Sequence, residues 1–227
     1  MKGPTGALEG GSASAQNCYG GGGSIMLWQK RPDLEREFTR LDLRTSAGRD
    51  SYGGKFKGDV NQTLAEDRAG YRLPFSIGLE KPFWLGSDRD IGERFTVAPS
   101  FLFKPSDELK FGLDTMFQYG DTPGYQGINV VDGRPAGSWD WDSDISSILG
   151  RDGRDRYLAF SVMPWMEWAP TEDYTLRAGG GFGWTGLEYN HFGPNSSGYN
   201  EKTPYEVSYH DRISRNYNAY VHNIYKL

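Results

Sequence analysis

From Phe38 onward, apolar and polar residues alternate along most of the chain. In the segment that begins near Leu109, for example, Phe111 and Leu113 alternate with Gly112 and Asp114. A repeat of two residues is the side-chain repeat of a β-strand that has one apolar and one polar face. The alternating segments are residues 39–45, 52–61, 71–79, 95–103, 109–119, 158–168, 174–184 and, more weakly, 217–225. The pattern therefore predicts about eight strands, with polar positions such as Asp114 on the face opposite the apolar one, and no amphipathic helix.

The connections between these segments are sorted by length. Residues 63–68, 104–108 and 169–173 form short polar turns, whereas residues 81–93, 120–155 and 185–213 form long loops. Only the brief first loop, residues 48–51, departs from the rule. Tight turns at one end and long loops at the other are typical of β-barrels in the outer membrane, and strands of about 10 residues match the tilted span of its apolar layer. The sequence predicts an all-β fold, an antiparallel transmembrane β-barrel segment that is open or incomplete.

Composition limits the partners and the membrane topology. Aromatic residues make up 15% of the chain, there are 31 glycines, and the mean hydropathy is -0.67. No stretch reaches the roughly 18 apolar residues that a helical membrane span needs. The net charge of -5 and the absence of a Lys/Arg cluster argue against a nucleic-acid partner. The single cysteine, Cys18, excludes an internal disulfide.

The N-terminal part differs from the rest of the chain. Residues 1–24 are rich in Gly, Ser and Ala, and residues 25–28 form a short apolar segment that Pro32 closes. No apolar stretch of signal-peptide length follows Met1. We therefore expect either that the chain stays inside the cell or that the N-terminal part of a longer protein is missing.

Several short motifs occur in an order and spacing that resemble those of the TonB-dependent siderophore receptors. They are Lys2-Gly3-Pro4-Thr5-Gly6-Ala7-Leu8, Gly22-Gly23-Ser24-Ile25-Met26-Leu27-Trp28-Gln29-Lys30-Arg31-Pro32, Val97-Ala98-Pro99-Ser100, Lys104-Pro105-Ser106-Asp107, Val131-Asp132-Gly133-Arg134-Pro135 and Trp168-Ala169-Pro170. The resemblance covers most of residues 1–184. It implies that residues 1–32 are the C-terminal part of a plug domain and residues 33–227 the N-terminal part of the barrel. The TonB box, most of the plug and about 14 of roughly 22 barrel strands would then lie outside this chain.

The resemblance also implies a function and partners. The chain would be part of a receptor for TonB-dependent uptake of ferric siderophores in the outer membrane of a Gram-negative bacterium, and it would not be functional as an isolated fragment. Its partners would be a ferric siderophore or similar chelate, the lipid bilayer, and the TonB energy-transducing complex through the missing N-terminal segment. No enzymatic activity, cofactor or metal site is expected.

Four residues are candidates for contact with the ligand. Glu9 stands where relatives usually have an aromatic residue, which in some of them faces the ligand. Tyr125, Trp139 and Trp141 lie in the longest predicted loop, where aromatic surfaces suit a large chelate.

The same loop leaves a different class of function open. Trp139 and Trp141 alternate with Asp140, Asp142 and Asp144, and carboxylates beside tryptophans occur in glycosidase clefts and can bind calcium. A soluble all-β carbohydrate-active enzyme or carbohydrate-binding module is therefore the alternative, because soluble β-sandwiches also alternate apolar with polar residues.

Overall fold

A computed structural model describes residues 29–49, 51–82, 91–123, 130–131, 134–135, 154–194 and 205–226. These residues form β-strands, turns and irregular segments, and none of them is helical. Within this part of the chain no helix is long and apolar enough to cross a membrane. The predicted all-β class is thus confirmed.

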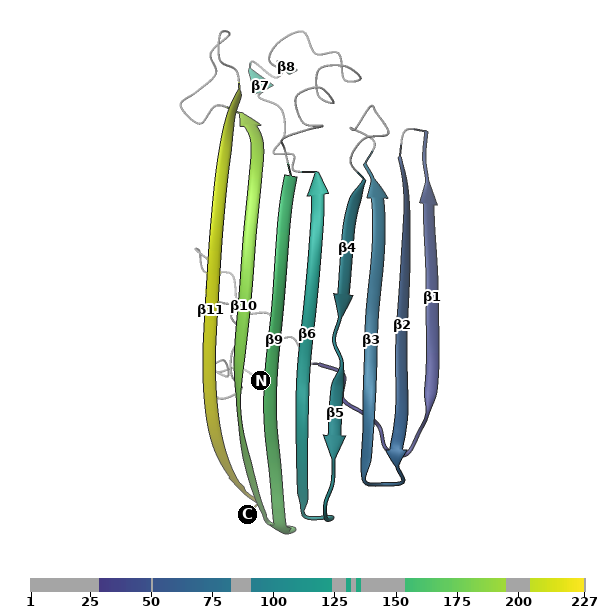
Figure 1. The fold of residues 1–227 in the computed structure, drawn as a ribbon, viewed down its shortest axis with the longest axis vertical. Helices are drawn as coiled ribbons and strands as arrows, with labels where there is room; N and C mark the ends of the chain where they lie inside the picture. Colours follow the sequence, from purple (N-terminus) through teal and green to yellow (C-terminus); the bar gives the residue numbers. More distant parts are fainter. Residues whose placement is uncertain are drawn as a thin grey trace.

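One antiparallel sheet of nine strands dominates the structure (Figure 1). Its strands are β1 (Phe38–Ala47), β2 (Tyr52–Ala65), β3 (Ala69–Lys81), β4 (Gly92–Val97), β5 (Ser100–Phe103), β6 (Leu109–Pro123), β9 (Arg154–Thr171), β10 (Tyr174–Pro194) and β11 (Tyr205–Tyr225). They lie side by side in chain order, with β4 and β5 sharing one place between β3 and β6. A two-stranded hairpin, β7 (Val130–Val131) and β8 (Arg134–Pro135), is separate from this sheet.

The shared place of β4 and β5 is a single wall strand with an interruption at Ala98 and Pro99. Proline has no N–H to donate to a ladder, so it breaks the strand at this point. The backbone remains tied to both neighbours, because Ala98 N donates to Pro74 O at 3.0 Å and Thr115 N donates to Pro99 O at 2.9 Å. Nine strands with β4 and β5 taken together give eight wall positions, as the alternation predicted.

The last two strands are longer than the sequence predicted. β10 and β11 run in register for 21 residues each, from the pair Tyr174↔Tyr225 to the pair Pro194↔Tyr205. Much of the loop predicted at residues 185–213 is therefore strand. Glycine and polar residues there hide the alternation, because strand pairing beyond an apolar band needs only backbone hydrogen bonds.

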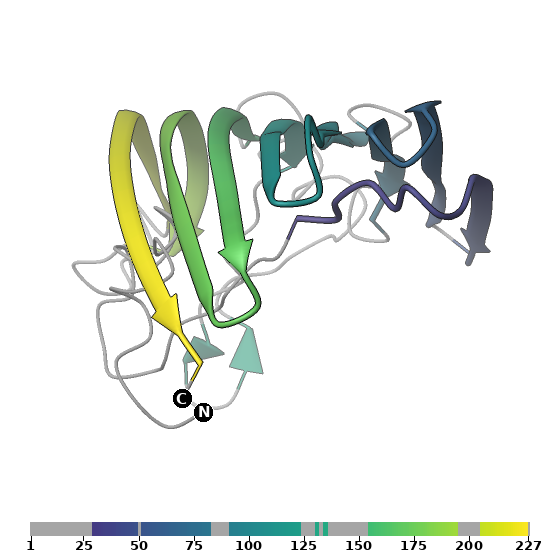
Figure 2. The ribbon, with the colours of Figure 1, turned by 90° about the horizontal axis from the view of Figure 1, so that it is seen from below.

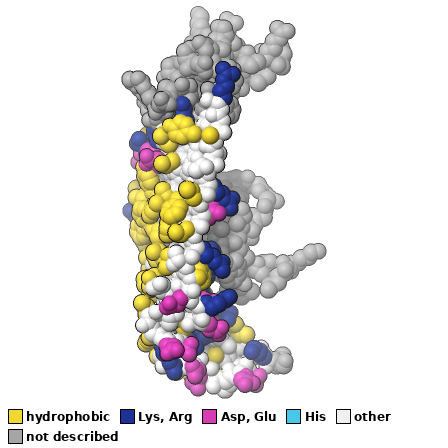
Figure 3. All heavy atoms as spheres, turned by 90° about the vertical axis from the view of Figure 1, so that its right-hand side faces the viewer, with side chains coloured by type: hydrophobic (Ala, Val, Ile, Leu, Met, Phe, Trp, Pro, Cys, Tyr) yellow, Lys and Arg dark blue, Asp and Glu magenta, His cyan; other side chains and the backbone are white. Residues whose placement is uncertain are grey.

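The two faces of the sheet differ in chemistry. Large apolar side chains gather along one face of the sheet (Figure 3), and the curvature of the sheet makes this the convex face (Figure 2). Many of them are exposed, including Leu41, Leu43, Phe56, Ile77, Phe101, Phe103, Phe111, Phe117, Leu158, Phe160, Val162, Trp168, Tyr217 and Val221. Rings on adjacent strands meet on this face, with centroids 6.0 Å apart for Phe95 and Phe117 and 5.5 Å apart for Phe160 and Phe182. The opposite, concave face carries charged and amide side chains along its middle, among them Asp59, Asn61 and Asp114.

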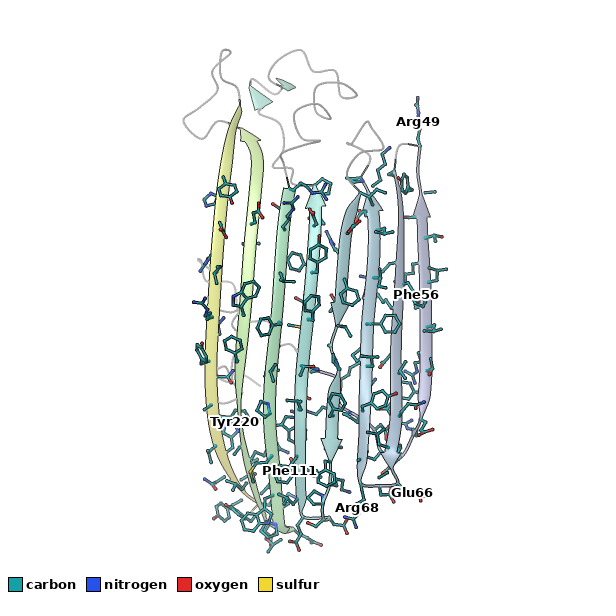
Figure 4. The ribbon with its side chains drawn as sticks, viewed as in Figure 1. Arg49, Phe56, Glu66, Arg68, Phe111 and Tyr220 are labelled. Atoms are coloured by element: carbon teal, nitrogen blue, oxygen red, sulfur yellow. The ribbon has the colours of Figure 1, made fainter. Side chains whose placement is uncertain are left out.

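The sheet is a single curved layer with two open edges. Within the described residues no second sheet packs against the apolar face, and β1 pairs only with β2, as β11 pairs only with β10. The tight turn between β2 and β3, which contains Glu66 and Arg68, lies at one end of the sheet, and Arg49 lies at the other (Figure 4). This is the geometry of part of a barrel wall, in which further strands would have to join the two edges.

Candidate functional site on the concave face

Residues 29–37, hereafter the crossing segment, run across the concave face before β1 begins (Figure 2). They form no strand of their own. Instead, their side chains and backbone bond to residues of β2, β3, β5 and β6 and to the interruption after β4. The most enclosed polar side chains of the sheet lie under this segment. They are Asp59, Asn61, Ser100 and Asp114, with exposed fractions of 8%, 0%, 0% and 4%.

The first residue of the crossing segment, Gln29, binds at the strand interruption of Ala98 and Pro99. The amide Nε2 of Gln29 donates to three backbone carbonyls, those of Ala98 and Pro99 at 3.1 Å and that of Thr115 at 2.7 Å. The hydroxyl of Ser100 donates to the carbonyl of Lys30 at 2.7 Å. The break at Pro99 therefore makes carbonyl acceptors available on the concave face, and Gln29 satisfies them. Two motifs quoted separately from the sequence, residues 29–32 and residues 97–100, contact each other here.

Lys30 shares a carboxylate with an arginine of the wall. Its Nζ lies 2.7 Å from Asp59 Oδ2. Arg72 from β3 binds the same carboxylate with two nitrogens, Nε to Oδ1 at 2.9 Å and an Nη to Oδ2 at 2.8 Å. Asp59 thus has two cationic partners, and the pair with Arg72 has the bidentate geometry that is strongest for a carboxylate.

Arg31 meets a more deeply enclosed carboxylate on β6. Its Nε and one Nη both lie 3.1 Å from Asp114 Oδ2, and its guanidinium carbon lies 3.9 Å above the ring of Trp165. Asp114 Oδ1 and Trp165 Nε1 are buried without a hydrogen-bond partner in the described part of the chain. Asp114 lies on the polar face, as the alternation predicts, and it is enclosed there because Arg31 and the indole ring cover it.

Asn61 holds the backbone of the crossing segment. Its Oδ1 accepts from Asp33 N at 2.9 Å, and its Nδ2 donates to the carbonyls of Asp33 at 2.7 Å and Arg36 at 2.5 Å. Buried Pro32 and the side chain of Leu34 lie against Gly70 of β3, where a Cβ would be 3.6 Å from Pro32 Cβ.

A local turn within the segment fixes its last residues. The backbone N–H of Glu35 donates to the carboxylate of Asp33 at 3.1 Å and, together with Arg36, holds the pKa of Asp33 below its usual value. Asp33 therefore stays ionised at neutral pH and keeps its ion pair with Arg36 at 3.1 Å.

Toward the long-loop end, the described side chains of the concave face include more cations than anions. Among the residues whose side chains the structure describes, the register places five basic ones there, Arg44, Lys55, Lys57, Arg94 and Arg212, and three acidic ones, Asp42, Glu80 and Asp155. Lys55, Arg94 and Arg212 are exposed. Such a surface attracts an anionic ligand.

The ligand contacts predicted from the sequence cannot be compared with this geometry. Glu9, Tyr125, Trp139 and Trp141 lie outside the described residues, as do Asp140, Asp142 and Asp144. Sequence reasoning missed the enclosed cluster of Arg31, Asp59, Asn61 and Asp114. No signal in the sequence set Asp59, Asn61 and Asp114 apart, because polar residues alternate with apolar ones throughout the predicted strands.

Two solved structures show which class of protein this fold resembles. No family model matches the chain, and a search of curated proteins gives no match. The sheet resembles part of the barrel of a TonB-dependent receptor. Among the similar structures are two crystal forms of the ferric-catecholate import receptor Fiu from E. coli K12. The closed form has a TM-score of 0.55 and the open form a TM-score of 0.54, each with 17% identity over 86% of this chain. The match covers 29% and 31% of those chains, so this chain spans about three tenths of their length.

Proposed function

We propose that this chain forms part of the wall of an outer-membrane receptor that imports ferric chelates of the siderophore type with energy from TonB. The observation that carries the proposal is the crossing segment, which lies on the polar concave face of an open, single-layer sheet whose convex face is apolar. The fold of the sheet is similar to part of a ferric-catecholate import receptor. A barrel wall needs lipid outside and a filled or wet interior, and the two faces match those two environments.

The crossing segment supports the division of the chain into two domains. In the proposed receptor, residues 1–32 are the end of the plug and residues 33–227 the first part of the barrel. Gln29, Lys30 and Arg31 bond to the wall through side chains, as a plug domain inside a barrel would. The sheet itself begins only at Phe38, so the crossing segment connects the two domains.

The charge of the concave face fits a catecholate ligand. Three doubly deprotonated catecholates around Fe³⁺ leave a net negative charge, and the surplus of basic side chains toward the long loops would attract such an anion. Glu9, Tyr125, Trp139 and Trp141 are proposed as further contacts from the plug and the longest loop.

Uptake of labelled iron tests the proposal. Iron-starved cells with the gene at its native locus receive ⁵⁵Fe-labelled ferric 2,3-dihydroxybenzoate, and uptake is compared with that of cells without the gene and of cells without TonB. We expect uptake to fall in both deletion strains and the chain to be found in the outer-membrane fraction. Normal uptake in cells that lack the gene, together with recovery of the chain in the soluble fraction, would contradict the proposal.

The soluble carbohydrate-active alternative is not favoured. A soluble sandwich would cover the apolar face with a second sheet, whereas the described residues leave that face exposed over β1 to β11.

A further inference from the structure

Lys30 and Arg31 of the crossing segment differ in the partners that Asp59 and Asp114 would keep if each basic side chain moved away. If Lys30 moved away, Asp59 would keep both hydrogen bonds from Arg72. If Arg31 moved away, Asp114 would lose the one cation that neutralises it within the described part of the chain. Because Asp114 is 4% exposed, its charge would remain enclosed without compensation, whereas the Lys30 contact is a partly exposed ion pair of small net value.

The backbone next to Arg31 is held equally firmly. The carbonyl of Arg31 accepts from an Nη of Arg72 at 3.2 Å. Asp33 lies two residues after Arg31, and its backbone N–H donates to the amide oxygen of Asn61. The amide nitrogen of Asn61 donates to the backbone carbonyls of Asp33 and Arg36. Pro32, between these bonds, is buried against Gly70. These contacts come from two neighbouring strands, Asn61 from β2 and Gly70 and Arg72 from β3, so the segment leaves the wall only if contacts to both strands break together.

We propose that residues 31–34 form a permanent joint with the sheet, that Arg31 is its positioning residue, and that the joint stays closed while the receptor imports its ligand. The last clause rests on the proposed function; the first two concern the folded chain alone. Arg31 determines where the segment crosses, since it joins Asp114 of β6 to the ring of Trp165 on β9.

A disulfide placed in the joint tests whether it opens. A Cβ at Gly70 would lie 3.6 Å from Pro32 Cβ, which is within the range of Cβ separations in disulfides. The experiment uses Pro32→Cys with Gly70→Cys in a Cys18→Ser background, with Leu34→Ala added in a parallel variant because Leu34 Cδ2 would be 2.8 Å from the new Cβ. The control pairs Pro32→Cys with Gly183→Cys on distant β10.

If the joint exists, positions 32 and 70 should cross-link rapidly under mild oxidation, and the control pair should not cross-link. The joint also predicts that oxidised cells import ferric 2,3-dihydroxybenzoate as fast as reduced cells. Failure of the first pair to cross-link in protein that migrates as folded on a gel would overturn the joint. Loss of uptake on oxidation, restored by reductant, would overturn its permanence. If the parent strain imports no ferric catecholate, the proposed function fails, and the cross-linking rates still decide whether the joint exists.

The same cross-linking rate identifies the positioning residue. Arg31→Met should slow cross-linking between positions 32 and 70 by roughly tenfold or more, because the seated segment would then enclose Asp114 without a cation to compensate its charge. Lys30→Met should slow it by less than about twofold. Arg31→Lys should restore part of the rate, since it keeps the charge without the planar group that stacks on Trp165. Equal effects of Arg31→Met and Lys30→Met, or none from Arg31→Met, would overturn the role of Arg31.

Discussion

Gly112 on β6 lies directly beneath the indole ring of Trp165 on β9. A Cβ built at Gly112 would be 2.0 Å from Trp165 Cε2, so no other residue fits without moving the ring. The pairing recurs on the concave face, where Tyr157 covers Gly120 and Tyr220 covers Gly179. A glycine on the next strand lets each ring lie flat against the wall. At Trp165 this flat position also supports the guanidinium of Arg31.

Gly112→Ala should therefore displace the ring of Trp165 and weaken the contact of this ring with Arg31 of the crossing segment. We expect a loss of roughly 1–3 kcal/mol in unfolding free energy, as for other overpacked sites, measured by urea titration in lipid vesicles. Gly183→Ala is the matched control, because the nearest atom to its Cβ would be a carbonyl oxygen 4.0 Å away. Equal losses for the two variants would show that Trp165 tolerates displacement.

Asn61→Asp should detach the crossing segment from β2. The change replaces the amide that donates to two backbone carbonyls with an anionic acceptor, and unsatisfied buried groups cost roughly 1–3 kcal/mol. Protease digestion of the segment should become faster. Asn218→Asp, an exposed position on the same face, makes the same charge change and should leave digestion unaffected.

Val162→Arg should destabilise the chain far more than Ser161→Arg. Val162 lies on the convex face, 38% exposed, whereas Ser161 lies on the concave face opposite Gly183. An arginine on the lipid side near the middle of the bilayer costs roughly 2–4 kcal/mol. Equal unfolding free energies of the two variants in vesicles would argue against the assignment of the faces. Asp114→Arg would be a poor control, because Asp114 is enclosed.

Lys57→Glu should weaken binding of an anionic ferric catecholate roughly three- to tenfold, with the effect fading at high salt. Lys81→Glu on the convex face makes the same charge change away from the concave surface and should alter the dissociation constant little. Fluorescence titration with ferric 2,3-dihydroxybenzoate measures both. A larger effect from Lys81→Glu would place the ligand elsewhere.

Much of the wall could be predicted from the sequence, because alternation such as that of Leu109, Phe111 and Leu113 reports which residues share a face. The break between β4 and β5 was harder to predict from the sequence. Pro99 marks its position, but the apolar residues before and after Pro99 continue the alternation of a single strand. The joint was not predictable. Arg31 and Asp114 are 83 residues apart, and they meet only because the register of β2 to β6 brings their elements together. The candidate contacts at Glu9, Tyr125, Trp139 and Trp141 stay predictions.

A spin-label scan along β9 tests the central claim most directly, that the sheet is a membrane wall with lipid on its convex face. Labels are placed singly at positions 157–162 of the chain in lipid vesicles, and their accessibility to oxygen and to a water-soluble nickel complex is measured. The account predicts a period of two, with positions 158, 160 and 162 accessible to oxygen and positions 157, 159 and 161 accessible to nickel. Low accessibility of the even positions to both reagents would mean that a second protein layer covers the apolar face, and it would contradict the membrane wall.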